Sequence, residues 1–144
     1  MNNKLRRLRD IAHKSGTSIF VIQETWGRNP TTDYSIKGFH VLLPAVRPGK
    51  GLNLCGGVGL WIKETIDFLN LKSPFTSKLL ETQTIHLPKR NLIIVNCYLP
   101  FEDQGKAVQE LTDHLRNIMN TYLMTDLIIT ADFNIDTFLP YPVP

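Results

Sequence analysis

The chain has 144 residues, of which 42% are hydrophobic and 20% charged, and its formal net charge is +3. This length and this balance are typical of one soluble globular domain and exclude a disordered chain. The charge is compatible with a phosphate-bearing partner, but it is too small to indicate nucleic-acid binding by charge alone.

Cysteine, histidine and apolar residues exclude several other classes of protein. The two cysteines, Cys55 and Cys97, provide neither a disulfide framework nor the ligand spacing of a zinc site, and the four histidines are scattered. No apolar run approaches the roughly 18 residues of a membrane span. Because no apolar stretch follows the basic start of the chain, a secretory signal is not expected. The sequence therefore predicts an intracellular protein that does not enter a membrane.

The first half of the chain has the pattern of a helix followed by strands. Residues 4–14 place their leucines and Ile11 on one side, which predicts an amphipathic helix that ends at Ser15-Gly16. Short apolar runs rich in β-branched residues predict three strands, each separated by a loop. These strands cover residues 17–23, 39–44 and 57–63, and residues 65–71 could continue the third after a turn.

The second half predicts a hairpin, a helix and a final strand. Polar residues separate strand-like runs at 82–87 and 92–99, as in a hairpin. Residues 105–123 carry apolar side chains at spacings of three and four, which predicts a helix, and a strand follows at 126–134. This order indicates a mixed α/β fold. The runs at 92–95 and 127–129 are apolar on both sides and are expected to lie mid-sheet, covered on both faces.

Three of these strands end on polar side chains. Glu24 follows the first strand, Tyr98 ends the hairpin, and Asp132 and Asn134 end the last strand. Ligand sites of open α/β sheets lie beyond the carboxyl ends of strands, so neighbouring strands that point the same way would gather these groups at one edge. Carboxylates with other oxygen donors suit a hard cation such as Mg²⁺, which polarises a phosphoryl oxygen.

Each of these residues also has a purely structural explanation. Asp132 and Asn134 are common turn formers, because their side chains bond nearby backbone groups. Glu24 precedes a loop, and an aromatic residue such as Tyr98 commonly packs at the end of a strand. Their joint occurrence at strand exits, in order, favours the functional interpretation.

Four segments that contain these residues resemble motifs of the endonuclease/exonuclease/phosphatase superfamily. They are IFVIQETW around Glu24, GGVGLWIK from Gly56, LIIVNCYLP around Tyr98, and IITADFNID around Asp132. Their order and spacing, with an amphipathic helix before the last, are most similar to the endonuclease domains of LINE-type retrotransposons. The resemblance implies a four-layer α/β-sandwich in which mixed β-sheets are covered by helices.

The resemblance also implies a role for each matching residue. Glu24 would be a ligand of Mg²⁺, or of Mn²⁺, and Tyr98 would place its hydroxyl against the scissile phosphate. Asp132 would orient or deprotonate the attacking water, and Asn134 would hold the water or the phosphate in line. The implied reaction is metal-dependent hydrolysis of a phosphate ester in DNA, with no small-molecule cofactor besides the metal. Action on genomic DNA would place the protein in the nucleus.

Basic and glycine residues lie beside these motifs. Arg28, Lys50 and Lys63 lie in or next to loops that would flank the site, where they could bind a nucleic-acid backbone or simply be solvated. Gly56-Gly57 has no expected chemistry and is expected to let a loop turn into a strand where packing is tight.

The resemblance is partial at both ends. Residues 1–144 are expected to form a single incomplete domain, without the first strand of the family and without its C-terminal Ser-Asp-His segment. None of the four histidines stands in the right order to replace the missing one, and Ala131 occupies the place of a motif glycine. The sequence thus predicts a weak or inactive endonuclease. A phosphatase-like enzyme acting on a phosphorylated lipid or nucleotide, and a non-catalytic binding module, are the alternatives.

Overall fold

The structure, a computed structural model, describes residues 2–25, 33–43, 56–71, 79–101 and 103–134. Within these ranges no helix is long and apolar enough to cross a membrane. The elements in chain order are α1 (Asn2–Lys14), β1 (Ile19–Gln23), β2 (Phe39–Leu42), β3 (Val58–Lys63), β4 (Leu69–Leu71), β5 (Glu81–Leu87), a 3-10 turn (Pro88–Arg90), β6 (Leu92–Tyr98), α2 (Gln104–Thr121) and β7 (Asp126–Asp132).

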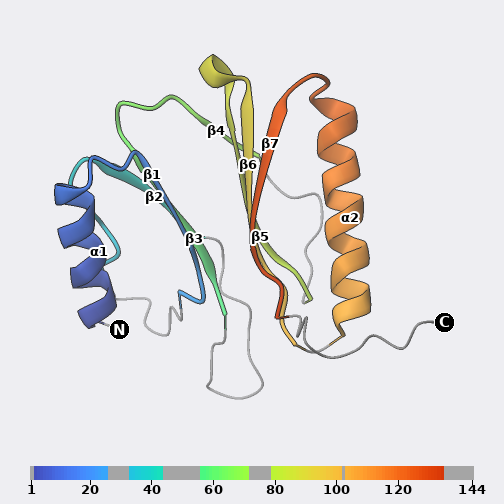
Figure 1. The fold of residues 1–144 in the computed structure, drawn as a ribbon, viewed down its shortest axis with the longest axis horizontal. Coiled ribbons are helices and arrows are strands. Elements are labelled where there is room, and N and C mark those ends of the chain that lie inside the picture. The colour runs from blue at the N-terminus through green and yellow to red at the C-terminus, as the bar shows by residue number, and fades with distance from the viewer. Residues whose placement is uncertain (1, 26–32, 44–55, 72–78, 102, 135–144) are drawn as a thin grey trace.

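These elements form four layers: α1, a three-stranded sheet, a four-stranded sheet and α2 (Figure 1). The first sheet has the order β1-β3-β2 and is antiparallel. The second has the order β4-β5-β6-β7, in which only β6 and β7 are parallel. The α/β-sandwich implied by the sequence motifs is therefore confirmed. Residues 65–71 do not continue β3, because their strand β4 pairs with β5 in the other sheet.

Helix α1 packs on the outer face of the first sheet, where it covers the indole of Trp61. This side chain is 2% exposed, packs in one cluster with Ala12 of α1, and donates a hydrogen bond from Nε1 to the Tyr34 carbonyl oxygen at 2.8 Å. Burying the 150–250 Å² of an aromatic side chain contributes roughly 4–6 kcal/mol at about 25 cal/mol per Å². The helix ends as predicted, at Gly16 in the left-handed region (φ +65°).

An apolar core fills most of the space between the two sheets. It contains Leu60, Ile62, Ile85, Leu87 and Ile94. Toward the carboxyl end of β6 the core gives way to Asn96, which is fully buried. Its Nδ2 donates to the carbonyl oxygens of Ile22 (3.1 Å) and Gly59 (3.2 Å), and its Oδ1 accepts from Gln23 Nε2 (2.7 Å). These bonds hold the end of β1 against β6.

Helix α2 covers the other face of the four-stranded sheet. Its buried side chains are Ala107, Leu111, His114 and Ile118. The expectation that residues 92–95 lie mid-sheet is confirmed, because β6 lies between β5 and β7. The same expectation for 127–129 is wrong: in the described part of the chain β7 has one neighbour, and Ile128 and Ile129 are 47% and 41% exposed. An apolar pattern reports which side chains can pack, not whether a further strand is present to cover them.

Candidate active site

The polar residues that follow β1 and end β6 and β7 come together from the two sheets rather than from one. Strands β6 and β7 are parallel neighbours that place Tyr98 opposite Asp132. The sequence interpretation assumed that β1 is also their neighbour. In the structure β1 pairs with β3 in the other sheet. The bond between Gln23 and Asn96 nevertheless holds the end of β1 over β6. Glu24, the next residue, is consequently close enough to Tyr98 to act on its pKa.

Tyr98 lies at the centre of this group. It is 9% exposed, and burial raises its pKa, because an apolar environment disfavours the phenolate. The negative charges of Glu24, Asp132 and Glu81 raise the pKa further, whereas a side-chain hydrogen bond with Asn134 acts in the opposite direction. The phenol is therefore protonated at neutral pH and can donate a hydrogen bond to an anionic group.

Asp132 and Asn134 form the turn that the cautious interpretation predicted. Asp132 Oδ1 accepts from the backbone N–H of Asn134 at 3.2 Å, and Asn134 has a left-handed φ of +48°. The Asn134 side chain donates from Nδ2 to the Leu99 carbonyl oxygen at 2.8 Å, and Gln104 Nε2 donates to the Asn134 carbonyl oxygen at 2.6 Å. The turn uses only part of the hydrogen-bonding capacity of the Asp132 carboxylate, because a carboxylate can accept about four hydrogen bonds.

Glu24 occupies the outer edge of the site. It is exposed and has a φ of +52°, a conformation that costs a non-glycine residue about 1–2 kcal/mol. The next residue, Thr25, donates its backbone N–H to the Gly57 carbonyl oxygen at 3.1 Å, which extends the pairing of β1 with β3 by one step. This contact fixes the direction of the chain at Glu24.

Gly56 and Gly57 turn the chain into β3 under tight packing, as the sequence predicted. Their φ values are +80° and +96°. A Cβ atom on Gly56 would lie 2.7 Å from Glu81 Oε1, and one on Gly57 would lie 2.2 Å from Thr25 Oγ1. Both distances are shorter than real Cβ contacts, so any other residue would displace a neighbouring side chain and strain the backbone.

Glu81 belongs to the site, and the sequence interpretation did not include it. It begins β5 opposite Tyr98, which is itself opposite Asp132, so the three side chains form one row on the same face of the sheet. Glu81 is 7% exposed, and its Oε2 accepts a hydrogen bond from the Gly57 N–H at 2.5 Å. In the sequence Glu81 only precedes the predicted hairpin strand, and its pairing with Tyr98 is known from the register of β5 with β6.

The donor set suits a hydrated cation rather than a closed protein cage. The described residues contain no cluster of three or more histidine, cysteine or acidic side chains that could enclose a metal. Magnesium is typically held through one or two carboxylates together with substrate phosphates, and it retains several waters. The exposed carboxylate of Glu24 fits this arrangement.

The remaining predicted residues are not part of this group. Arg28 and Lys50 lie outside the described residues. Lys63 ends β3 at the opposite end of the strand from Gly57, and its Nζ donates to the Gly16 carbonyl oxygen at 3.0 Å. The structure thus places Lys63 at the end of α1, away from the strand exits.

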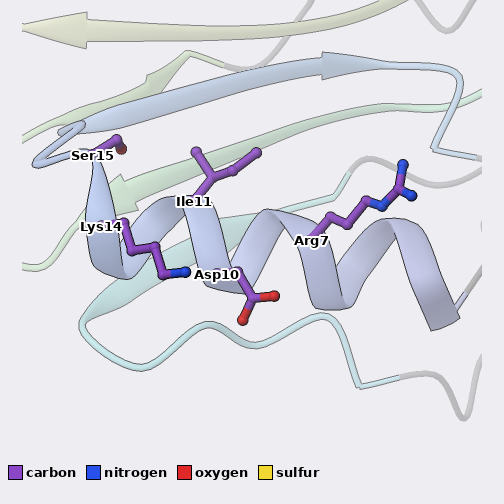
Figure 2. Close-up of a pocket in the computed structure, with 5 residues that line it drawn as sticks. All are labelled: Arg7, Asp10, Ile11, Lys14 and Ser15. Carbon is purple, nitrogen blue, oxygen red and sulfur yellow. The ribbon is translucent and has the colours of Figure 1, made fainter.

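The four histidines, all in the described part of the chain, also lie elsewhere. His114 bonds Thr84 beneath α2, His86 packs on Tyr122, His40 packs on Phe68, and His13 is in the last turn of α1. A hollow on the surface is likewise separate from the strand exits, since it lies along the outer side of α1 (Figure 2). It is lined by Arg7, Asp10, Ile11, Lys14 and Ser15.

The fold is shared with a nuclease domain of known structure. The chain is similar to the endonuclease domain of TRAS1, a telomere-specific non-LTR retrotransposon, with a TM-score of 0.59 and 15% identity. The match covers 92% of this chain and 54% of that one, so the chain spans about half the length of the TRAS1 domain. No protein-family model and no curated protein matches the sequence. The likeness shows that the chain has the fold that its motifs resemble.

Proposed function

We propose that this chain carries a site for Mg²⁺-dependent hydrolysis of phosphodiester bonds in DNA. One observation carries the proposal: the parallel pairing of β6 with β7 sets Asp132 beside Tyr98, and the bond between Gln23 and Asn96 holds the end of β1, which precedes Glu24, over the same strand. These groups come from both sheets of a fold shared with a retrotransposon endonuclease domain. Such a group of oxygen donors around a protonated phenol suits a phosphate ester better than an apolar ligand.

Each side chain has a distinct task in this proposal. Tyr98, protonated because burial and three carboxylates raise its pKa, donates a hydrogen bond to a phosphate oxygen. Asp132 orients the attacking water and accepts its proton, and the Asn134 amide holds the water or the phosphate in line. Glu24 would hold Mg²⁺, which supplies charge stabilisation at the phosphate when bound.

We expect the hydrolysis to be slow. All four histidines, which are within the described part of the chain, lie outside the site. A positioned general acid or base contributes about 10²–10⁴-fold to a rate. A site without an imidazole to protonate the leaving oxygen should therefore be slower than a complete one by a factor of this order.

Nicking of supercoiled plasmid DNA in the presence of Mg²⁺ tests the proposal. Glu24→Ala and Asp132→Ala should each lower the nicking rate by about 10²-fold or more, because each removes a group that acts at the reacting phosphate. Chelation of the metal with EDTA should abolish nicking. Glu64→Ala is the matched control, since Glu64 is an exposed carboxylate beyond the other end of β3.

The alternatives predict different results in the same assays. Nicking that survives both substitutions would show that the site is wrongly assigned. Phosphate release from a phosphoinositide without any nicking would favour a phosphatase. Retention of DNA without cleavage, unaffected by EDTA, would favour a binding module.

A further inference from the structure

The carboxylate of Glu81 is buried where a charge is expensive. Ionised side chains are almost never fully buried unless they are paired or hydrogen-bonded, yet Glu81 is 7% exposed at the start of β5. Its place in the ladder puts it in one row with Tyr98 and Asp132. A buried carboxylate in line with two site residues suggests a role in the site.

A continuous set of hydrogen bonds connects Glu81 to the exposed edge of the site. Glu81 Oε2 accepts from the Gly57 N–H at 2.5 Å, and the Gly57 carbonyl oxygen accepts from the Thr25 N–H at 3.1 Å. Thr25 directly follows Glu24, which is held in a left-handed conformation. The two backbone groups of Gly57 thus join a side chain of the second sheet to the end of β1 in the first.

Packing makes this connection rigid. The backbone at Gly56 approaches the Glu81 carboxylate so closely that a Cβ would lie 2.7 Å from Oε1, and it would lie 3.0 Å from Tyr98 Cε1. At Gly57 the space is filled by the Thr25 side chain, 2.2 Å from the position of a Cβ. The turn is therefore enclosed by Glu81, Tyr98 and Thr25, and it moves only if they move.

We infer that Glu81 is a positioning residue for the phosphodiester site: its carboxylate fixes the Gly56-Gly57 turn and, through Thr25, the direction of Glu24. This inference rests on the proposed function for the meaning of Glu24, but the connection itself does not depend on activity. Groups that orient a metal-binding side chain typically alter metal affinity or activity about 10–100-fold when they are replaced.

Three substitutions separate positioning from charge and from general stability. Glu81→Gln keeps the side-chain length and a carbonyl oxygen that can accept from Gly57, so it should retain the position of the turn. Glu81→Asp keeps the charge but is shorter by one methylene group, and Glu81→Ala removes the acceptor, so both should release the turn. Glu64→Ala, at an exposed glutamate, is the matched control.

The first measurement is the amide NMR spectrum of the full chain without metal. The Gly57 amide signal should change in every Glu81 variant, because its hydrogen-bond acceptor changes. The Thr25 amide bonds to Gly57 rather than to residue 81, so its signal should move in Glu81→Asp and Glu81→Ala but stay in place in Glu81→Gln and Glu64→Ala. Titration with Mg²⁺, followed at the Thr25 amide, should then show an affinity about 10–100-fold lower in the first two variants only. A thermal unfolding curve confirms that each variant is folded, and Glu81→Asp keeps the test open if Glu81→Ala does not fold.

The outcomes distinguish this inference from the proposed function. An unchanged Thr25 amide in Glu81→Asp, or equal shifts of that amide in Glu81→Asp and Glu81→Gln, would overturn the positioning role. A protein that neither binds Mg²⁺ nor nicks DNA would overturn the proposed function, and the amide signals would still report whether Glu81 holds the turn.

Discussion

At the scale of single residues, β1 and β7 are both followed by residues in the left-handed backbone conformation, which residues other than glycine rarely adopt. Glu24 and Asn134 have φ values of +52° and +48°. Such conformations cost about 1–3 kcal/mol each and persist only where the surroundings impose them. The bond from the Thr25 N–H to the Gly57 carbonyl oxygen and the bond from the Asn134 N–H to Asp132 hold these two conformations. The shape of the site therefore lowers the stability of the fold.

Gly57→Ala should lower the free energy of unfolding by roughly 1–3 kcal/mol, because the left-handed backbone and the contact with Thr25 both oppose a methyl group. Denaturation in urea measures the change. Gly105→Ala is the control: Gly105 is in the first turn of α2 with nothing within 4 Å of a Cβ. It should be neutral or stabilise the protein by up to about 1 kcal/mol. Equal effects of the two substitutions would contradict the strained-turn explanation.

At the scale of elements, β7 is an edge strand of the four-stranded sheet in the described part of the chain, as β4 is on the other side. Its residues 127–131 contain no charge and no proline, the features that usually protect an edge strand. Ile128 and Ile129, on opposite faces, are both exposed. The parallel pairing with β6 brings Asp132 to Tyr98, so a strand that completes the site also has an unprotected edge.

Ile129→Lys should reduce self-association, because a charge on an open strand disfavours edge-to-edge pairing. Ile129 is 41% exposed, so little folding free energy should be lost. Val108→Lys is a matched control on α2, also 41% exposed and away from the edge, and it should leave association unchanged. Light scattering over a concentration series gives the comparison. A reduction of the same size in both variants would point to net charge rather than to the strand edge.

At the scale of the whole molecule, the four layers are joined by buried polar contacts as well as by apolar packing. Asn96 joins the two sheets through Ile22, Gly59 and Gln23. On the other side of the second sheet, His114 joins α2 to β5, with Nε2 3.0 Å from Thr84 Oγ1. Burial lowers the pKa of His114, because the imidazolium cannot be solvated there.

Stability should fall in mild acid. Below the ordinary histidine pKa of about 6.5 the unfolded chain binds a proton that folded His114 resists. The free energy of unfolding should therefore decrease by up to about 1.4 kcal/mol per pH unit as the pH falls from about 6.5 toward the lowered pKa. Urea denaturation at several pH values measures this slope. His114→Gln should flatten it, and His13→Gln, at an exposed position in α1, should not. A slope that is the same in all three proteins would exclude His114 as its source.

Local signals in the sequence were sufficient for the elements and for most of the candidate site. The amphipathic pattern of 4–14, the Gly16 stop and the apolar runs predicted helices and strands that the structure contains. These features depend on neighbouring residues only, so a linear pattern contains them. The polar strand exits at Glu24, Tyr98 and Asp132 were visible for the same reason.

Tertiary structure alone decided which strands are neighbours. A strand pattern does not specify its partners, so the placement of β1 in the other sheet, of β4 beside β5 and of β7 at the edge followed from packing. Glu81 shows the consequence most clearly. In the sequence it precedes an ordinary hairpin strand, and only the register with Tyr98 and the approach of Gly57 bring it into the site. The sequence by itself determined the elements and the chemistry of their ends, whereas long-range pairing decided which of those ends meet.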